Sequence, residues 1–188
     1  ALLWSAAGGY ARAYMAGTQN TKRFAAWWLL TMSGSLGVFI AGDLLSFYLA
    51  FAVASLAAFG LVVQDGTKAA RGAGALYLLL AVLGEIALLF AVALLAVASP
   101  DDSLAIADVV TPLATSRGND IIALLLVLGF GLKMGLVPLH VWLPIAHPAA
   151  PMPASAVLSG AIIKAGVIGL IRFLPETGAP EAWGIALT

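Results

Sequence analysis

Long apolar runs separated by short polar segments form the main pattern along the chain. Five runs are long enough to cross a bilayer as helices, and they cover residues 24–41, 44–63, 72–98, 120–146 and 154–174. Shorter apolar stretches at 1–10 and 183–188 predict partial helices at both ends of the sequence. The pattern therefore predicts an all-α integral membrane protein with about five full transmembrane helices. Because the sequence opens without Met and stops inside an apolar stretch, we interpret it as a piece of a longer protein.

The composition agrees with a membrane protein. Hydrophobic residues make up 62% of the 188 residues and charged residues only 10%, whereas a soluble domain has about 45–50% apolar and about 25% charged residues. Residues 1–188 are therefore expected to form a single transmembrane module surrounded by the lipid bilayer. Nine Lys and Arg balance nine Asp and Glu without forming a basic run, so no nucleic-acid partner is expected.

The chain contains no cysteine. This excludes a disulfide framework, a thiolate metal site and iron–sulfur ligation within the sequence. We therefore expect no cofactor and no metal in this chain, and any linked redox chemistry would belong to another subunit.

The positive charges are distributed unequally between the two sides of the predicted bundle. The loops at 10–23 and 64–71 together carry five Lys and Arg, whereas the 99–119 loop carries one. Cytoplasmic loops of membrane proteins are enriched in Lys and Arg, so the first two loops are predicted to be cytoplasmic. Alternation of the spans places the turn at His147 on the same side.

Two local signals concern the second span. Asp43 follows Gly42 directly before this span, where its side chain is placed to cap the first turn of the helix. Ala50, Ala54 and Ala58 recur at four-residue spacing and form a face of small side chains. Such a face predicts close approach by a neighbouring helix.

Three charged residues lie near the middle of otherwise apolar spans. They are Glu85, Lys133 and Lys164. A charge at this depth costs about 2.5–3.5 kcal/mol on insertion scales, which makes a functional role the first hypothesis. Burial favours the neutral form of each group and mutual attraction favours the charged form, so a lysine and a carboxylate could exchange protons. The alternative is a static ion pair that locks the helices together.

The fourth span is interrupted beside Lys133. Pro138 cannot donate a hydrogen bond to the carbonyl of Met134, and Gly135 allows the backbone to bend. These residues predict a broken helix at a depth where ordered water could reach the freed carbonyl. A kink without function is the alternative interpretation.

Two histidines follow the predicted break. Histidine as a residue type can exchange protons at physiological pH, so His140 could be a point where protons enter or leave on the cytoplasmic side. His147 precedes Pro148 in a turn, where a structural role at the surface is as well supported as a functional one.

The residues around the break carry a family resemblance. The pattern K-x-G-x-x-P-L-H-x-W-L-P-x-A-H-P-x-A-P-x-P-A-S-A-x-x-S-G begins at Lys133, and I-I-K-A-G-x-x-G-L-I-R-F follows over 162–173. Together they resemble the antiporter-like proton-conducting membrane subunits of respiratory complex I, multisubunit Na+/H+ antiporters and membrane-bound hydrogenases. The A-H-P-x-A-P-x-P-A-S-A-x-x-S-G part of this motif is most similar to the large antiporter-like subunit of formate hydrogenlyase-type hydrogenases.

The resemblance implies a module built from two inverted repeats, each with a broken helix, of which this chain would be the first. It also implies a bacterial or archaeal cell membrane, and partner subunits from a respiratory or hydrogenase complex. In the family, the positions of Lys133 and Lys164 belong to the proton path, whereas His140 carries no firm role.

This chain departs from the family at one position. Family members usually carry a glutamate on the helix corresponding to 44–63, paired with the lysine of the broken helix, and here that position is Ala52. We interpret Glu85, on the following helix, as the replacement for that carboxylate. The alternative is that this subunit has lost or altered ion pumping.

These observations predict a non-catalytic subunit that translocates protons, with Na+ as an open alternative, within a redox-driven membrane complex. The relay would use Glu85, Lys133 and Lys164. Two other functions stay open from the sequence. One is a non-pumping anchor that holds a peripheral oxidoreductase at the membrane, and the other is an antiporter that works without redox partners.

Overall fold

The protein is described by a computed structural model that covers residues 2–18, 20–99, 103–110 and 119–173. The described residues are almost entirely helical, and five helical segments are long and apolar enough to cross a membrane. These segments are Thr21–Ile40, Leu44–Val62, Lys68–Ala98, Asp120–Ala149 and Met152–Phe173. The predicted fold class is therefore confirmed, while the partial helix expected at 183–188 lies outside the described residues.

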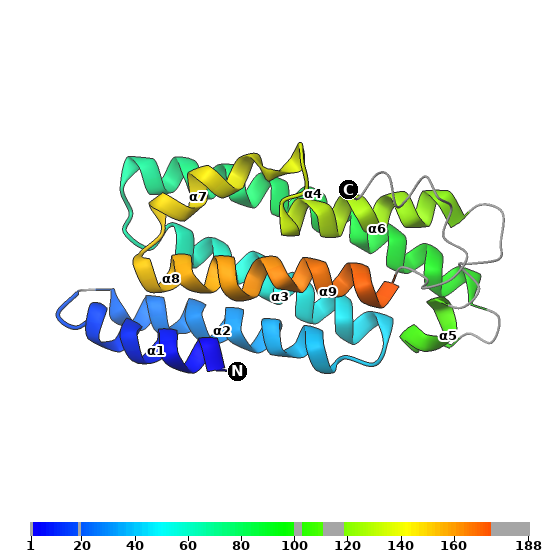
Figure 1. Ribbon diagram of the computed structural model, residues 1–188, viewed down its shortest axis with the longest axis horizontal. Coiled ribbons are helices and arrows are strands. Elements are labelled where there is room, and N and C mark those ends of the chain that lie inside the picture. The colour runs from blue at the N-terminus through cyan, green and yellow to red at the C-terminus, as the bar shows by residue number, and fades with distance from the viewer. Residues whose placement is uncertain (1, 19, 100–102, 111–118, 174–188) are drawn as a thin grey trace.

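The helices are named as in Figure 1. The chain begins with α1 (Leu2–Tyr14), α2 (Thr21–Ile40), α3 (Leu44–Val62), α4 (Lys68–Ala98) and the short α5 (Ile106–Val110). The fourth span consists of α6 (Asn119–Met134), the 3₁₀ helix η2 (Leu139–Trp142) and α7 (Leu143–Ala149). The fifth span consists of α8 (Met152–Val157), the π-helical turn η3 (Leu158–Ile162) and α9 (Ile163–Phe173).

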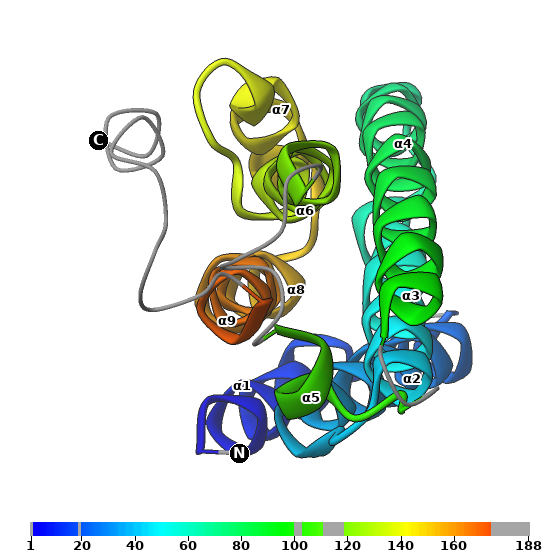
Figure 2. The same cartoon turned by 90° about the vertical axis from the view of Figure 1, so that its right-hand side faces the viewer.

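The five spans form a ring around a common interior. Helix α2 packs on α3, α3 on α4, α4 on α6 and α6 on α9, and α9 returns to contact α2. The view along the bundle shows this arrangement, with α1 on the outside against α8 (Figure 2). Large apolar side chains, among them Leu29, Leu79 and Phe90, are exposed on the outer surface, as expected for helices in contact with lipid.

Small residues bring α2 and α3 into close contact. A Cβ atom at Gly34 would lie 2.7 Å from the carbonyl oxygen of Ala50 and 2.9 Å from the Cα of Ala54. A Cβ atom at Gly37 would lie 2.8 Å from the Cβ of Ala50. The small face predicted on the second span is therefore confirmed as a helix-packing surface, because backbones approach closely only where side chains are absent or short.

One end of the bundle is closed by polar contacts with the turn between α2 and α3. The Asp43 side chain accepts a hydrogen bond from Ser46 N at 2.9 Å, which confirms the predicted cap and lowers the pKa of its carboxyl. The segment before α5 pairs with the same turn, since Leu44 N donates to the carbonyl of Leu104 at 2.8 Å.

Arg172 ties the last span to the same end. Its guanidinium donates to the carbonyl oxygens of Val38 at 2.9 Å and Ala41 at 2.5 Å, where α2 ends. It also lies 5.6 Å from the ring centroid of Phe47. A cation at a helix C-terminus satisfies carbonyls that have no partner within the helix. This contact closes the ring between α9 and α2.

The opposite end holds the α1–α2 loop, the α3–α4 loop and the α7–α8 turn, as Figure 1 shows. Arg23 donates to the Gln64 carbonyl at 2.7 Å, and the Gln64 amide donates to the Asn20 carbonyl at 3.2 Å. The loops predicted to be cytoplasmic, together with the turn after His147, therefore lie at one end of the molecule.

Replacing Gly34 by Ala should destabilise the protein, because the new Cβ would overlap the backbone of α3. Overpacking of this kind costs about 1–3 kcal/mol. The measurement is the thermal unfolding midpoint of the full-length protein in detergent. Gly72→Ala is the matched control, since a Cβ at Gly72 meets nothing within 4 Å. Equal midpoints for the two variants would contradict the close α2–α3 packing.

Candidate functional site

The fourth span breaks one residue after Lys133. Helix α6 ends at Met134, and Gly135 adopts φ +78°, a left-handed conformation that favours glycine. The backbone N–H groups of Gly135 and Leu136 both donate to the carbonyl of Gly131, at 2.8 and 2.9 Å. After Pro138 the chain continues as η2 and α7. The predicted interruption of this span at Gly135 and Pro138 is therefore confirmed.

The break leaves the carbonyl of Leu132 without a helical partner, and a side chain from beyond the break takes it. The indole Nε1 of Trp142 donates to this oxygen at 2.8 Å. Trp142 is fully buried, so the bond satisfies an acceptor that water would otherwise have to reach. Its ring also lies edge-on to Tyr77, with centroids 5.2 Å apart and an interplanar angle of 71°.

Lys133 is buried in the ring interior, with 5% of its surface exposed. Its ammonium donates to the hydroxyl of Ser55 at 3.0 Å and to the hydroxyl of Tyr77 at 2.8 Å. Tyr77 in turn donates its own hydroxyl hydrogen to the Ser55 carbonyl at 2.8 Å. The lysine from α6 is thus held by one side chain from α3 and one from α4.

Glu85 lies on the same cavity as this lysine, with 6% of its surface exposed. Among the described residues, neither carboxylate oxygen has a hydrogen-bond partner. The cavity has a volume of about 10 Å³, which is room for about one water molecule. The lining consists of Phe51, Ser55, Tyr77, Leu80, Ala81, Gly84, Glu85, Gly129, Leu132, Lys133 and Trp142.

The cavity lies between two apolar clusters in the interior. Tyr77 and Trp142 belong to a cluster that includes Trp4 and Trp28. Phe51 belongs to the other cluster, in which Phe47, Phe51, Phe130 and Phe173 pack against one another. Apolar surroundings strengthen the attraction between opposite charges and raise the cost of keeping either group charged alone. A proton transfer that neutralises both groups avoids that cost.

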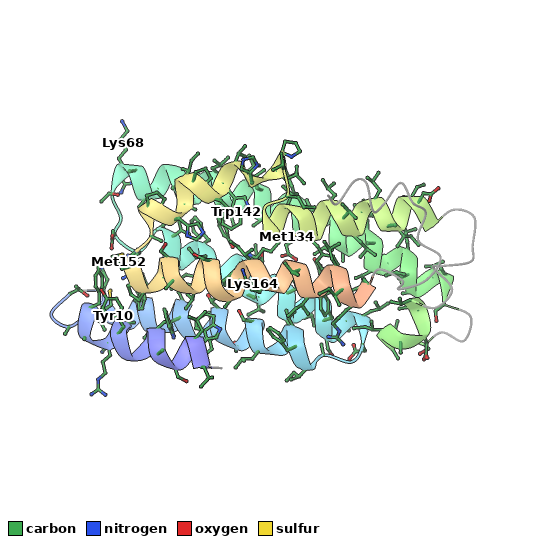
Figure 3. All side chains as sticks on the ribbon, in the orientation of Figure 1. Tyr10, Lys68, Met134, Trp142, Met152 and Lys164 are labelled. Atoms are coloured by element: carbon green, nitrogen blue, oxygen red, sulfur yellow. The ribbon has the colours of Figure 1, made fainter. Side chains whose placement is uncertain are left out.

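Lys164 is not part of the cavity. It lies near the beginning of α9, directly after η3, and its side chain is exposed in the isolated chain. Figure 3 places it near the level of Met134 along the bundle. The π-helical turn accommodates one extra residue per turn and so sets the rotation of α9, including Lys164, relative to α8. The structure therefore brings together Glu85 and Lys133, two of the three mid-span charges.

The two histidines have different surroundings. His140 is partly buried in η2, and its Nδ1 has no partner among the described residues. In contrast, Nδ1 of His147 lies 3.1 Å from Ser155 Oγ and 3.3 Å from Ser159 Oγ. These contacts join α7 to α8 and η3 across the turn. Neither histidine lines the cavity that holds Lys133.

Sequence reasoning missed three residues that hold the lysine in place, namely Ser55, Tyr77 and Trp142. Two of them could have been predicted from their helical spacing to other residues. Ser55 lies three residues after Ala52, and Tyr77 lies eight residues before Glu85, so each pair shares one face of its helix. Hydroxyl groups on the same face as a buried charge are a usable signal. Within the described residues, no group of three His, Asp or Glu side chains could hold a metal ion.

A family model described as "NADH:quinone oxidoreductase/Mrp antiporter, TM" matches residues 41–185. Hydrogenase-4 component B from Escherichia coli K12 is 40% identical over 144 residues, which are 74% of this chain and 21% of that protein. Formate hydrogenlyase subunit 3 from the same organism is 48% identical over 71 residues, 37% of this chain and 12% of that protein.

The fold is similar to that of a solved membrane complex. The structure of the Mrp complex from Dietzia sp. DQ12-45-1b matches with a TM-score of 0.77 and 26% identity, over 86% of this chain and 18% of the matched chain. The chain therefore spans about a quarter or less of the length of these similar proteins.

Replacing Trp142 by Phe should destabilise the break, because the buried carbonyl of Leu132 would lose its donor. An unsatisfied buried acceptor costs about 1–3 kcal/mol. The thermal unfolding midpoint of the full-length protein measures this loss. Trp4→Phe is the control. Trp4 is also buried, and its ring lies edge-on to Trp28 with the ring centroids 5.0 Å apart. Unlike Trp142, it has no side-chain hydrogen bond among the described residues. A larger loss for the Trp4 variant would contradict the assigned role of the indole.

Proposed function

The chain belongs to the NADH:quinone oxidoreductase/Mrp antiporter transmembrane family, and from this premise we propose that it conducts protons as part of a larger redox-driven membrane complex. It would form the first inverted repeat of its protein. A bacterial or archaeal cell membrane would hold it, with the α1–α2 and α3–α4 loops on the cytoplasmic side.

One observation carries the proposal. A lysine and a glutamate, Lys133 and Glu85, share a buried cavity beside a helix break, in the interior of a ring of membrane spans. Burying an unpaired charge in this position is costly, and neither group is needed to fill the apolar interior. Groups that can exchange a proton, with space for about one water between helices, are the elements that a proton path requires.

We assign the carboxylate role to Glu85. Family members usually place a glutamate where this chain has Ala52, one helical turn before Ser55 on α3. Because Ser55 contacts Lys133 directly, a carboxylate at position 52 would be directed toward the same region. Glu85 reaches that region from α4 instead, so the lysine retains an acidic neighbour after the loss of the usual one.

Lys164 would pass the proton from this repeat to the remainder of the protein. Its exposed position on α9 suits contact with the remainder of the protein, since the chain covers only about a fifth of a relative such as hydrogenase-4 component B. His140 would connect the cavity toward the cytoplasmic end, since it lies between the break and the α7–α8 turn.

Protons fit the cavity better than Na+. Oxygen atoms of Ser55, Tyr77 and Glu85 line it, but the ammonium of Lys133 already occupies the position of a cation on two of them. A second cation there would meet like-charge repulsion. A proton can instead be carried by the lysine itself.

Lys133→Met and Glu85→Gln are both expected to reduce proton translocation to the background leak, a loss of about 100-fold or more for groups that transfer protons directly. Proton uptake into inverted membrane vesicles that contain the full-length protein in its complex is the measurement. Lys68→Met serves as the control, because Lys68 is exposed at the beginning of α4.

The double variant Ala52→Glu/Glu85→Gln then tests the relocation of the carboxylate. It should recover part of the proton uptake that Glu85→Gln loses, because it restores the usual position of the acidic group. Full uptake by Glu85→Gln alone would refute the relocation. Intact uptake by Lys133→Met would refute proton conduction through this cavity and would favour a membrane anchor.

A further inference from the structure

The ammonium of Lys133 donates hydrogen bonds to two hydroxyl groups and not to Glu85. A lysine ammonium has three N–H donors, and two of them bind the hydroxyls of Ser55 and Tyr77. The ammonium also lies 5.2 Å from the centroid of the Tyr77 ring. Neither oxygen of Glu85 receives a hydrogen bond from the described residues, although both groups line one cavity. The lysine therefore donates to neutral oxygens, whereas Glu85 lies within electrostatic range of Lys133 without a hydrogen bond to it.

We propose that Ser55 and Tyr77 are positioning residues that keep Lys133 from forming a static ion pair with Glu85. The inference rests on the proposed function, in which Lys133 carries the transferred proton. The two hydroxyls stabilise the charged lysine in one position, and Glu85 receives the proton when the ammonium turns toward it or when one water joins the two groups. A direct ion pair would instead stabilise both charges and oppose transfer.

The direction of the hydrogen bonds excludes Tyr77 as a carrier in this arrangement. Its single hydroxyl hydrogen is donated to the Ser55 carbonyl, so toward Lys133 the oxygen can only accept. The hydroxyl therefore fixes the ammonium without passing a proton onward. Ser55 contributes twice, since its side chain binds the lysine and its carbonyl orients Tyr77.

The position of these hydroxyls is linked to the helix break. Tyr77 packs edge-on against Trp142, and Trp142 donates to the Leu132 carbonyl next to Lys133. A displacement of the segment after the break would therefore move Trp142, then Tyr77, and so the resting position of the ammonium. These contacts join the broken helix to the lysine through Tyr77 on α4 as well as through the backbone of α6.

The other titratable groups that line the cavity around Lys133 are Tyr77 and Glu85, both from α4. Helix α3 contributes Phe51 and Ser55 to the lining, and η2 contributes Trp142. On α9, Lys164 is exposed, and Arg172 is bound to the end of α2. Outside the lining, Tyr48 on α3 lies within electrostatic range of Glu85. Because Ser55→Ala and Tyr77→Phe leave Tyr48 in place, a change in the pH dependence after either substitution reports on the Lys133–Glu85 pair.

Ser55→Ala and Tyr77→Phe in the full-length protein within its complex test the proposal, with proton uptake measured across a range of pH. A hydrogen bond accepted from an ammonium favours its charged form, so each variant should move the alkaline limit of uptake to lower pH by about one unit. The maximal uptake should fall by about ten-fold, since the ammonium is no longer held in place.

Two matched controls remove hydroxyls away from the cavity. Tyr10→Phe alters a half-exposed tyrosine on α1 whose ring packs against Tyr14, with the ring centroids 5.8 Å apart. Ser35→Ala alters a buried serine on α2 whose hydroxyl donates to the Thr31 carbonyl at 2.7 Å. Both controls should keep the pH dependence of the unmodified protein.

The results separate this inference from the function on which it rests. If Lys133→Met abolishes uptake while Ser55→Ala and Tyr77→Phe keep the normal pH dependence, the positioning role is refuted and proton conduction stands. An equal shift of the alkaline limit of proton uptake in the control variants also refutes the positioning role. If Tyr77→Phe does not assemble, Ser55→Ala alone decides, because it removes one oxygen atom and leaves the backbone contacts in place. Uptake that persists in Lys133→Met refutes the function itself.

Discussion

The burial of one ammonium group determines how the interior of this bundle is built. Lys133 is shielded from bulk water in its place between α3, α4 and α6, so the neighbouring helices provide oxygen atoms to it. Ser55 and Tyr77 do so, and the bond from Tyr77 to the Ser55 carbonyl joins α3 to α4 at the same point. Helix packing and charge stabilisation therefore depend on the same few contacts.

The broken helix supplies both the location of this site and its support. The interruption frees the Leu132 carbonyl next to the lysine, and the segment beyond the break returns Trp142 to bind it. In a lipid environment every freed backbone group needs such a partner, because exposure to the hydrocarbon would cost several kcal/mol. Val137 at the break is exposed, but the freed carbonyl of Leu132 is buried and is bound by Trp142.

The ring of five spans is closed, yet one mid-span charge remains on its outside. Arg172 fastens α9 to the end of α2, and small residues bring α2 against α3, so the interior is complete without further helices. Lys164 nevertheless lies exposed on α9. A lysine at this depth requires a polar neighbour in the assembled protein, and such a neighbour would come from beyond the residues described. The bundle is thus closed around Lys133, whereas Lys164 is exposed.

The amino-acid pattern alone was enough to predict the membrane class, the number of full spans, the cap at Asp43 and the place where the fourth span breaks. These features depend on local chemistry, since apolar length, a missing proline N–H and a short polar side chain act within a few residues. The sequence also singled out Glu85 and Lys133 as mid-span charges, because any charge at that depth is costly, and the structure places both on one cavity. Helix packing, in contrast, was needed to show that Ser55, Tyr77 and Trp142 line the cavity of Lys133 and that Lys164 is exposed. Those outcomes depend on the rotation and contact of helices far apart in the chain, which close packing of side chains fixes and no local pattern contains.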